Sequence, residues 1–336
     1  MSKHFIRNIY LSTFFHIALC LTNGYDNKNV WCLSLKEAKA FSPGHITGFF
    51  QICDQPNDPL KKGSRGAGVS IVHGVTTKVR VKKSAKTSFK IMINGDVRSS
   101  AFVSEHVVNA FLSLVKGNYM ILMEHDVKVP IGQGFGSSGA GALSLALALN
   151  EAFNLNLTRF EAAQMAHIAE VKCKTGLGTV IAETFGGLAI RVKPGAPGVG
   201  QIKSIPINED YVVASLSLGP ISTMEILTDE NYRQRINEIG GNLVDELTKD
   251  LTPNHFMEFS RKFAEHVGLI SKRLRAVLEE NDNACLTCSM AMLGESVFTI
   301  VKRDQVKEVQ QIFNKHASFQ SNVIIADIDF KGARLL

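Results

Sequence analysis

A glycine-rich segment between a strand and a helix constrains this chain more than any other feature. It reads Pro130-Ile-Gly-Gln-Gly-Phe-Gly-Ser-Ser-Gly-Ala-Gly141, follows a predicted strand at 119–123 and opens a predicted helix at 138–153. Glycines let the backbone approach a ligand closely, and the free N–H groups at the start of a helix attract anions. The segment therefore predicts a phosphate site; the alternative is a glycine turn that serves close helix packing.

Two familiar phosphate motifs do not fit this segment. A P-loop ends in Gly-Lys followed by Ser or Thr, and the segment contains no Lys. Gly134, Gly136 and Gly139 match the dinucleotide fingerprint, but that motif requires a strand with an acidic tip after the helix. Here a second predicted helix, 159–172, follows the first one, and this excludes a Rossmann unit.

The periodicity of the whole chain predicts an α+β fold in two halves. Period-2 alternation and β-branched residues indicate strands, and apolar residues at helical spacing indicate helices. A Pro- and Gly-rich joint at 194–200 separates the two halves. We expect a first strand from 36–43, further strands at 69–72, 76–81, 89–93, 119–123, 188–192, 211–218 and 323–328, and helices at 101–114, 138–153, 159–172, 229–249, 253–269, 271–280 and 305–316.

Composition narrows the class of protein. With 336 residues, 45% hydrophobic and 20% charged, the chain suits two domains or one two-lobed unit and is not a disordered protein. Six cysteines do not make a disulfide scaffold at this length, so we expect a reducing, cytoplasmic location. No apolar run reaches 18 residues, so we expect no membrane insertion. The net charge of +6 does not call for a nucleic-acid partner.

Residues 1–36 differ from the rest of the chain. Lys3 and Arg7 precede an apolar stretch at 9–22, which is the layout of a signal peptide. His16 interrupts that stretch, however, and no small-residue cleavage site follows it. We interpret residues 1–36 as an extension outside the fold, arising from a start codon assigned too early, with a targeting segment as the alternative.

Three blocks of the sequence together resemble the GHMP kinases. Pro130–Ala142 is similar to the second motif of that family, Phe41–Gly48 to the first, and Leu286–Phe298 to a degenerate third. The resemblance implies a kinase that uses ATP and Mg²⁺. It also implies a two-lobed fold, with an N-terminal lobe like the second domain of a small-subunit ribosomal protein and a ferredoxin-like C-terminal lobe. We expect these lobes as an ATP-binding domain at 37–200 and a C-terminal domain at 201–336.

Further blocks resemble one branch of the family, the archaeal pantoate kinases. These are Gly63-Ser-Arg-Gly-Ala-Gly68, Thr175-Gly-Leu-Gly178, and the pair Gly186-Gly187 with Arg191. The resemblance extends from about residue 38 to the C-terminus. It implies ATP-dependent phosphorylation of pantoate to 4-phosphopantoate, a step towards coenzyme A, by a homodimer.

The resemblance also implies roles for individual residues. Ser138 and Glu170 would hold Mg²⁺, a hard cation that prefers oxygen ligands. Ser64, His167 and Arg191 would bind pantoate, with Arg191 gripping the carboxylate through a two-point fork. His167 and Glu170 are three residues apart on a predicted helix, so we expect them on one face and at a common site. The positions that would bind ATP are Pro130, Gly132, Gly134, Gly136, Ser137, Ser138, Gly139 and Ala140.

One position departs from the family pattern. Relatives of this branch are expected to carry a catalytic Asp seven residues before the Gly-Gly pair, and here that position is Thr179. Glu183, one helical turn further on, is an alternative carboxylate. Phosphoryl transfer depends mainly on positioning and charge neutralisation, so we expect a binder with a reduced rate. The alternatives are a kinase for another small hydroxy acid or alcohol, such as homoserine or mevalonate, and a silent nucleotide-binding regulatory protein.

Overall fold

The structure is a computed structural model that describes residues 35–98, 100–319 and 321–336. Residues 35–336 form one compact unit. Residues 1–34 of the predicted N-terminal extension lie outside the described residues. Its last residue was assigned wrongly, because Lys36 is the first residue of strand β1 (Lys36–Cys53) and pairs with Val81.

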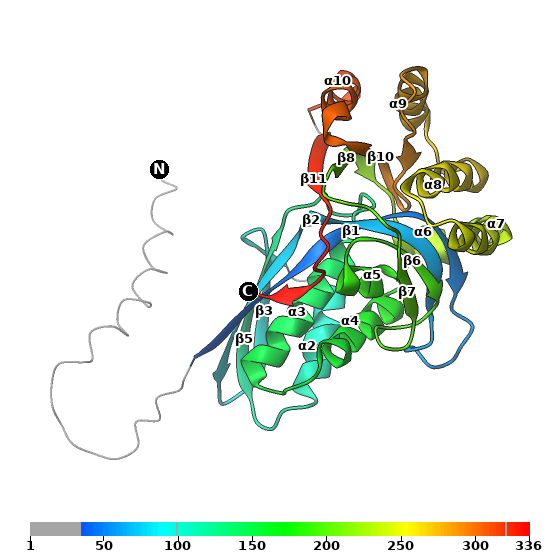
Figure 1. Cartoon of the computed structure of the whole chain (residues 1–336). Coiled ribbons are helices and arrows are strands. Elements are labelled where there is room, and N and C mark those ends of the chain that lie inside the picture. The colour runs from blue at the N-terminus through cyan, green and yellow to red at the C-terminus, as the bar shows by residue number, and fades with distance from the viewer. Residues whose placement is uncertain (1–34, 99, 320) are drawn as a thin grey trace, which may run out of the picture. The chain divides into compact units, whose positions relative to one another are not determined.

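An eight-stranded sheet forms the larger layer of this unit (Figure 1). Its strands follow the order β12-β1-β2-β5-β3-β4, while β6 pairs with β2 and β7 pairs with β6. These pairs are antiparallel except β3 with β5. The strands are β1 (Lys36–Cys53), β2 (Gly63–Lys83), β3 (Ser88–Ile93), β4 (Asp96–Arg98), β5 (Tyr119–Val127), β6 (Leu188–Lys193), β7 (Gln201–Ser204) and β12 (Arg334–Leu335).

Strand β1 changes character along its length. Near its start Ala38 is buried and Glu37 is exposed, which is the alternation of a strand with one face in water. From Ser42 onward almost every residue is buried or half-buried, because other elements cover both faces. The register of its pairing with β2 shifts at Pro43/Gly44, and such bulges bend a strand. The doubly covered half of β1 is the part that reaches the cavity described below.

Four helices cover one face of the larger sheet (Figure 1). Helix α3 is the central one and packs against β1, β2, α2 and α4. It is rich in Ala and Leu and is buried almost all round, as expected for a helix inside a domain. The helices are α2 (Phe102–Leu112), α3 (Ser137–Phe153), α4 (Arg159–Cys173) and α5 (Thr179–Phe185).

The second half of the chain forms a smaller sheet with its own helices. Its four strands are antiparallel in the order β11-β8-β10-β9. The strands are β8 (Tyr211–Pro220), β9 (Ser289–Met290), β10 (Gly294–Lys302) and β11 (Asn322–Asp327). The helices are α6 (Thr223–Thr228), α7 (Glu230–Lys249), α8 (Pro253–Val267), α9 (Lys272–Asn283) and α10 (Val306–His316), with a 3₁₀ turn, η1, at Arg303–Gln305.

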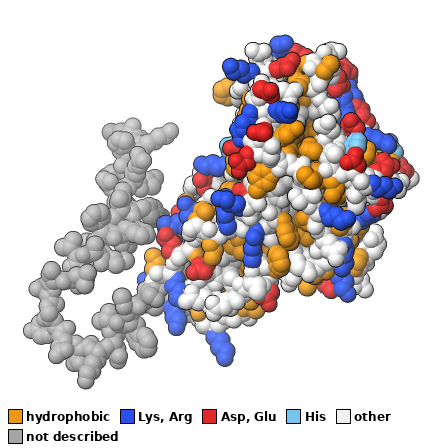
Figure 2. Space-filling view, viewed as in Figure 1, with side chains coloured by type: hydrophobic (Ala, Val, Ile, Leu, Met, Phe, Trp, Pro, Cys, Tyr) orange, Lys and Arg blue, Asp and Glu red, His pale blue; other side chains and the backbone are white. Residues whose placement is uncertain are grey.

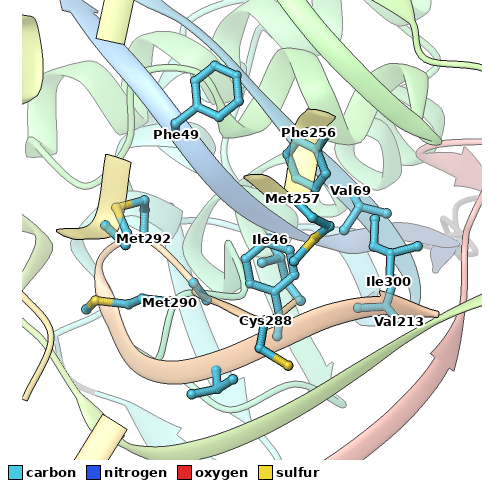
Figure 3. Packing of buried hydrophobic residues seen from close by; sticks show 14 of the residues in the cluster. Ile46, Phe49, Val69, Val213, Phe256, Met257, Cys288, Met290, Met292 and Ile300 are labelled. Atoms are coloured by element: carbon cyan, nitrogen blue, oxygen red, sulfur yellow. The ribbon is translucent and has the colours of Figure 1, made fainter. Parts of the chain in front are cut away.

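A continuous hydrophobic cluster joins the two sheets. Ile46 and Phe49 of β1 belong to the same buried cluster as Phe256 of α8 and Ile300 of β10 (Figure 3). The ring centroids of Phe49 and Phe256 are 6.3 Å apart. Strand β1 therefore belongs to the larger sheet while its apolar side chains anchor the helices of the second half.

The predicted strands and helices all overlap observed ones, and the α+β class is confirmed. Helices α5 and α6 were not predicted, because seven and six residues are too few to establish a helical period. Strands β7 and β12 lie after residue 200 in the chain but belong to the larger sheet. The division into domains at residue 200 stays a prediction.

Acidic and basic side chains are interspersed over the face shown in Figure 2. A mixture of signs is typical of a solvated surface rather than of a surface that binds a polyanion. Within the part of the chain that the structure describes, no helix combines the length and the apolar character needed to cross a membrane.

Candidate active site

A cavity opens where the glycine-rich segment meets helix α3. Its wall is formed by β1, β2, the glycine-rich segment, residues 175–179, β6, α6 and the loop before β10. Eight of the residues predicted to bind ligand line this cavity. They are Ser64, Gly132, Gly134, Gly136, Ser137, Ser138, Thr179 and Arg191.

The backbone of the glycine-rich segment is held in place by its carbonyl groups. The Gly132 carbonyl accepts a hydrogen bond from the Ile221 N–H at 3.0 Å, and the Phe135 carbonyl accepts one from the His45 N–H at 2.9 Å. These bonds tie the segment to β1 on one side and to the end of β8 on the other. The segment is therefore fixed in shape before any ligand binds.

The N-terminus of α3 is open to the cavity. Gly132, Gly134 and Gly136 have φ angles of 73°, 89° and 66°, in the left-handed region that favours glycine. Gly136 is the N-cap residue of α3, and no side chain caps the helix. The first N–H groups of a helix carry partial positive charge, so Ser137 and Ser138 stand at an anion site.

The other predicted ATP-binding positions lie behind this wall. Gly139 and Ala140 are buried in the first turn of α3, and Pro130 is half-buried at the start of the segment. None of the three lines the cavity. These three residues therefore support the shape of the segment and do not line the cavity.

The three sequence blocks at 41–48, 130–142 and 286–298 meet at the cavity. The Met292 N–H donates to the Thr47 carbonyl at 2.9 Å, which joins the third block to the first. The Ser296 hydroxyl donates to the Gln133 carbonyl at 2.8 Å, which joins the third block to the second. Met292 also lines the cavity. The short segment after β9 thus closes the site from the second half of the chain.

Glu170 lies in a group of hydroxyls behind the cavity wall. Its carboxylate accepts hydrogen bonds from Thr175 Oγ1, at 2.7 Å, and from Ser138. The side chain is buried, and burial raises the pKa of Glu170 while these two hydroxyls lower it. Ser138 and Thr175 both line the cavity, so Glu170 stands one layer behind the anion site. This oxygen-rich arrangement suits a hard divalent cation.

Arg191 is held in the cavity wall by a histidine. Its Nη1 donates to His45 Nε2 at 3.3 Å, and His45 Nδ1 lies 3.2 Å from Ser70 Oγ. Burial, and then the charge of Arg191, keep the pKa of His45 well below its usual value, so the imidazole is neutral. Because Nε2 accepts from Arg191, the proton of a neutral ring lies on Nδ1 and is donated to Ser70.

The positive charge of Arg191 is buried without an acidic partner. The residue is 2% exposed, yet it lines the cavity. Burial lowers its pKa to about 10, so the guanidinium stays charged at neutral pH. Within the described residues Arg191 forms no ion pair, and its Nε has no hydrogen-bond partner. A buried unpaired cation is costly, and an anionic ligand would stabilise it.

Ser64 stands beside this guanidinium. A Cβ atom on Gly178 would collide with Ser64 Oγ and would lie 2.6 Å from Arg191 Nε. The hydroxyl and the guanidinium therefore converge on the same glycine of the cavity wall. Strand β6, which carries Arg191, pairs with β2, which carries Ser64, and this pairing brings the two residues together.

Thr179 lines the cavity at the first residue of α5. Its methyl carbon lies 2.6 Å from the position that a Cβ on Gly136 would occupy, and its hydroxyl lies 3.6 Å from the corresponding position at Gly176. Thr179 thus stands between the glycine-rich segment and the loop that covers Glu170. It can offer a hydroxyl to a ligand but not a negative charge.

His167 is not brought to the cavity wall. It is buried, and its Nε2 lies 3.0 Å from the Lys62 carbonyl and 3.2 Å from the Pro59 carbonyl. Two carbonyl acceptors require that Nε2 carries the proton. His167 and Glu170 do lie within one turn of α4, but their side chains bind different partners. The expected common site stays a prediction; the contacts that the structure gives His167 are with the loop that leads to Ser64.

Some cavity residues were missed by the sequence analysis. Phe50, Leu227 and Leu293 give the wall an apolar part, and Thr223 adds a hydroxyl. Phe50 adjoins the first motif, which could have pointed to it. Leu293 lies in the block at 286–298, which could also have pointed to it. Thr223 and Leu227 lie in a short segment whose sequence carries no motif, and only the folding of the second half brings them to the site. His45 stood in a quoted motif, but its role became visible only through its contact with Arg191.

Comparisons with known proteins show the family to which the chain belongs. The family described as GHMP kinases N terminal domain matches residues 103–187. The chain is 36% identical over 272 residues to a pantoate kinase of Methanocaldococcus jannaschii, covering 81% of this chain and 96% of that protein. It is 36% identical over 282 residues to a pantoate kinase of Thermococcus kodakarensis, covering 82% and 91%.

A solved structure has a similar fold. A phosphotransferase related to the CoA biosynthesis pathway superposes with a TM-score of 0.78 at 32% sequence identity. The match covers 89% of this chain and 98% of that one. The chain belongs to the GHMP kinases, with their two-lobed α+β fold, and within them to the pantoate kinase family.

Proposed function

We propose that the protein transfers the γ-phosphate of ATP to the primary hydroxyl of pantoate, on C4, giving 4-phosphopantoate on the way to coenzyme A. The observation that carries the substrate is Arg191, a buried cation at the cavity wall that has no acidic partner among the described residues. A substrate carboxylate would complete that pair, with Ser64 as a further donor.

The apolar part of the cavity supports pantoate over a more polar acid. Pantoate carries two methyl groups on the carbon between its hydroxyl-bearing carbons. Phe50 and Leu227 line the same cavity as Ser64 and Arg191 and would cover those methyl groups. Burial of methyl groups against such side chains contributes about 0.8 kcal/mol for each carbon.

The glycine-rich segment and the start of α3 would hold the phosphates of ATP. We place Mg²⁺ beside Ser138 and Glu170, since a buried carboxylate and hydroxyls are the oxygen ligands this ion prefers. When bound, the ion would neutralise charge on the transferring phosphoryl group. Ser138 and Glu170 are thus expected to orient the triphosphate, while Arg191 orients the acceptor.

His167 would act indirectly in this scheme. Its hydrogen bonds to the Pro59 and Lys62 carbonyls fix the loop just before Ser64. We therefore assign it a positioning role for pantoate. The expected homodimer stays a prediction, because the described structure is a single chain.

A coupled assay of ADP release tests the function. We expect turnover with pantoate, and at least tenfold lower kcat/KM with homoserine and mevalonate, neither of which offers the same match to Arg191 and the apolar wall. Preference for one of those acceptors would support a related kinase instead. Tight ATP binding without acceptor-dependent ADP release would support the silent regulatory protein, for which Thr179 is the motivating feature.

The Thr179→Asp variant tests whether the missing carboxylate limits the rate. A general base contributes roughly 10²- to 10⁴-fold, and Thr179 lines the cavity where an Asp could accept the acceptor's proton. We expect kcat on pantoate to rise by at least about tenfold. Thr179→Asn, similar in shape but uncharged, serves as the control. Equal kcat values for wild type and Thr179→Asp would show that no base is lacking.

A further inference from the structure

Glu183 is the most unusual charged residue outside the roles described so far. It lies on α5, one turn after Thr179, and is 0% exposed. Both of its carboxylate oxygens are buried and have no hydrogen-bond partner within the described part of the chain. Buried polar atoms are nearly always paired in folded proteins, so two orphan oxygens on one side chain indicate a missing partner.

The orphan oxygens lie against the backbone of the glycine-rich segment. Glu183 Oε1 lies 2.7 Å from the position that a Cβ on Gly136 would occupy, and Oε2 lies 3.1 Å from the corresponding position on Gly139. Gly136 itself lines the cavity. Because Gly136 has no side chain, Glu183 packs directly against the backbone of a residue that lines the cavity.

Glu170 approaches the same region from the opposite side. A Cβ on Gly176, another residue of the cavity wall, would collide with Glu170 Oε2. Thr179 lies between the two carboxylates, near Gly136 and Gly139 on one side and near Gly176 on the other. Burial, and then the charge of Glu170, hold the pKa of Glu183 well above its usual value. The two acids are therefore close enough to interact through their charges.

Two buried carboxylates beside an anion site are unfavourable unless a cation joins them. Each ionised group loses its hydration, the two repel each other, and a bound triphosphate would add further negative charge. A divalent cation reverses all three effects and finds hard oxygen ligands in Glu170, Glu183 and the hydroxyls of Ser138 and Thr179. A neutral, structural Glu183 would leave its oxygens equally unpaired, so it does not account for the geometry.

We propose that Glu183 is a second carboxylate of the magnesium site, reaching it past Gly136 and supplying the metal with the negative charge that Thr179 cannot. The proposal rests on the proposed use of Mg-ATP. It assigns Glu183 to the metal and leaves the acceptor hydroxyl to other groups. Glu170 and Glu183, on neighbouring helices, would then hold the cation between them.

The test measures how far a metal strengthens nucleotide binding. Calorimetry gives the Kd of the β,γ-methylene analogue of ATP with Mn²⁺ and again in EDTA, and their ratio is the metal enhancement. In Glu183→Gln we expect this enhancement to fall at least about tenfold, in the range found when metal-site partners are removed. In EDTA the analogue should bind the variant as tightly as wild type or more tightly, because a negative charge near the phosphates is gone.

Two further variants separate this role from a structural one. Glu151→Gln removes the same charge from an exposed position on α3 and should keep the wild-type enhancement. Adding Thr179→Asp to Glu183→Gln returns a carboxylate to the cavity wall and should restore most of the enhancement. Gln keeps the size and shape of Glu but carries no charge, so this variant tests the charge alone. An unchanged metal enhancement in Glu183→Gln would overturn the proposal.

A measurement on the wild type keeps the proposal testable if Glu183→Gln does not fold. Anomalous scattering from Mn²⁺ in crystals with the analogue should place the ion about 2.1 Å from an oxygen of Glu183 as well as of Glu170. An ion bound by Glu170 alone would overturn the proposal. Failure of the wild type to bind the analogue under either condition would instead overturn the proposed use of ATP, so the two failures are distinguishable.

Discussion

At the scale of single residues, the cavity is organised around charges that the folded chain leaves unbalanced. Arg191 is buried without an acid, and Glu183 is buried without a donor, within the described residues. Each arrangement costs folding free energy, and each would be relieved by a ligand of opposite charge. Local strain of this kind is typical of functional sites. A substrate carboxylate and a divalent cation are the two charges that would restore the balance.

Replacing Arg191 should affect the acceptor far more than ATP. A hydrogen bond to a charged group contributes about 1.5–3 kcal/mol, so Arg191→Met should raise the KM for pantoate by roughly 10- to 100-fold with little change in the KM for ATP. Arg65→Met is a matched control, since Arg65 is a neighbour of Ser64 but pairs with Asp245 on the surface. Steady-state kinetics gives both constants; equal increases in both would contradict the assignment.

The same variant has an expected effect on stability. Arg191→Met removes a buried cation that has no acidic partner among the described residues, and apolar replacements of buried charges are often neutral or stabilising. The free energy of unfolding, measured in urea, should therefore not fall. A lower value would show that the hydrogen bond from Arg191 to His45 outweighs the cost of burying the charge.

At the scale of elements, β1 brings the two sheets and the site together. Helix α7 packs onto β1 at Gly240, where a Cβ would collide with the Phe50 carbonyl. On the same strand, a Cβ on Gly48 would collide with Ser260 Oγ of α8. Phe50 lines the cavity, so the helices of the second half hold the site in shape through their contact with this strand.

Gly240→Ala should lower the free energy of unfolding, although the same substitution inside a helix usually raises it. Ala is normally better than Gly inside a helix by about 1 kcal/mol. At Gly240 the new methyl group meets backbone that cannot rotate away, so we expect a loss of about 1–3 kcal/mol in the free energy of unfolding.

Gly141→Ala on α3 is the control for that prediction. The nearest atom to a Cβ there is His125 Nδ1 at 4.0 Å, so the methyl group has room. This variant should be neutral or stabilising by up to about 1 kcal/mol. Urea unfolding measures both changes, and a stabilised Gly240→Ala would mean that α7 shifts on β1 without cost.

At the scale of the whole molecule, a buried histidine sets a limit on acid stability. His125 contacts Thr77 Oγ1 at 2.8 Å and Ser104 Oγ at 3.2 Å inside the N-terminal half. Burial lowers the pKa of His125 from 6.5 to about 4. Because the unfolded chain binds this proton more readily, His125 lowers the free energy of unfolding as the pH falls from 6.5 towards 4.

His125→Asn should isolate this effect. The variant should be less stable than wild type at pH 7, and the difference should shrink by about 3 kcal/mol by pH 4. Urea unfolding across this pH range gives the difference directly. Comparing the two proteins removes the contributions of Glu170 and Glu183, whose raised pKa values act in the opposite direction. A difference that stays constant with pH would contradict the prediction.

Removal of residues 1–34 should leave the enzyme intact. Both sheets and every residue of the cavity lie within residues 35–336, which form one compact unit. We expect the kcat, the KM for pantoate and the free energy of unfolding to match those of the full chain. A tenfold loss of kcat in the shortened chain would show that the extension contributes to the site.

The sequence predicted a glycine-rich segment between a strand and a helix, and the structure has this arrangement, which is local in the chain. The glycines, the strand before them and the helix after them all lie within about 35 residues, so spacing alone identifies them. The short helix α5 was missed because its seven residues are too few to establish a helical period. Its role depends on where Thr179 and Glu183 stand relative to α3, and periodicity carries no information on such contacts.

The sequence by itself determined the fold class and the family, since these depend on local pattern and on motifs that survive in the chain; the phosphate site stays a prediction. Only the tertiary structure decided which charges lack a partner. It placed Arg191 against His45, His167 against the Lys62 carbonyl and Glu183 against Gly136. Burial and pairing are properties of the packed molecule, because they depend on atoms that are distant in sequence and meet only in the fold.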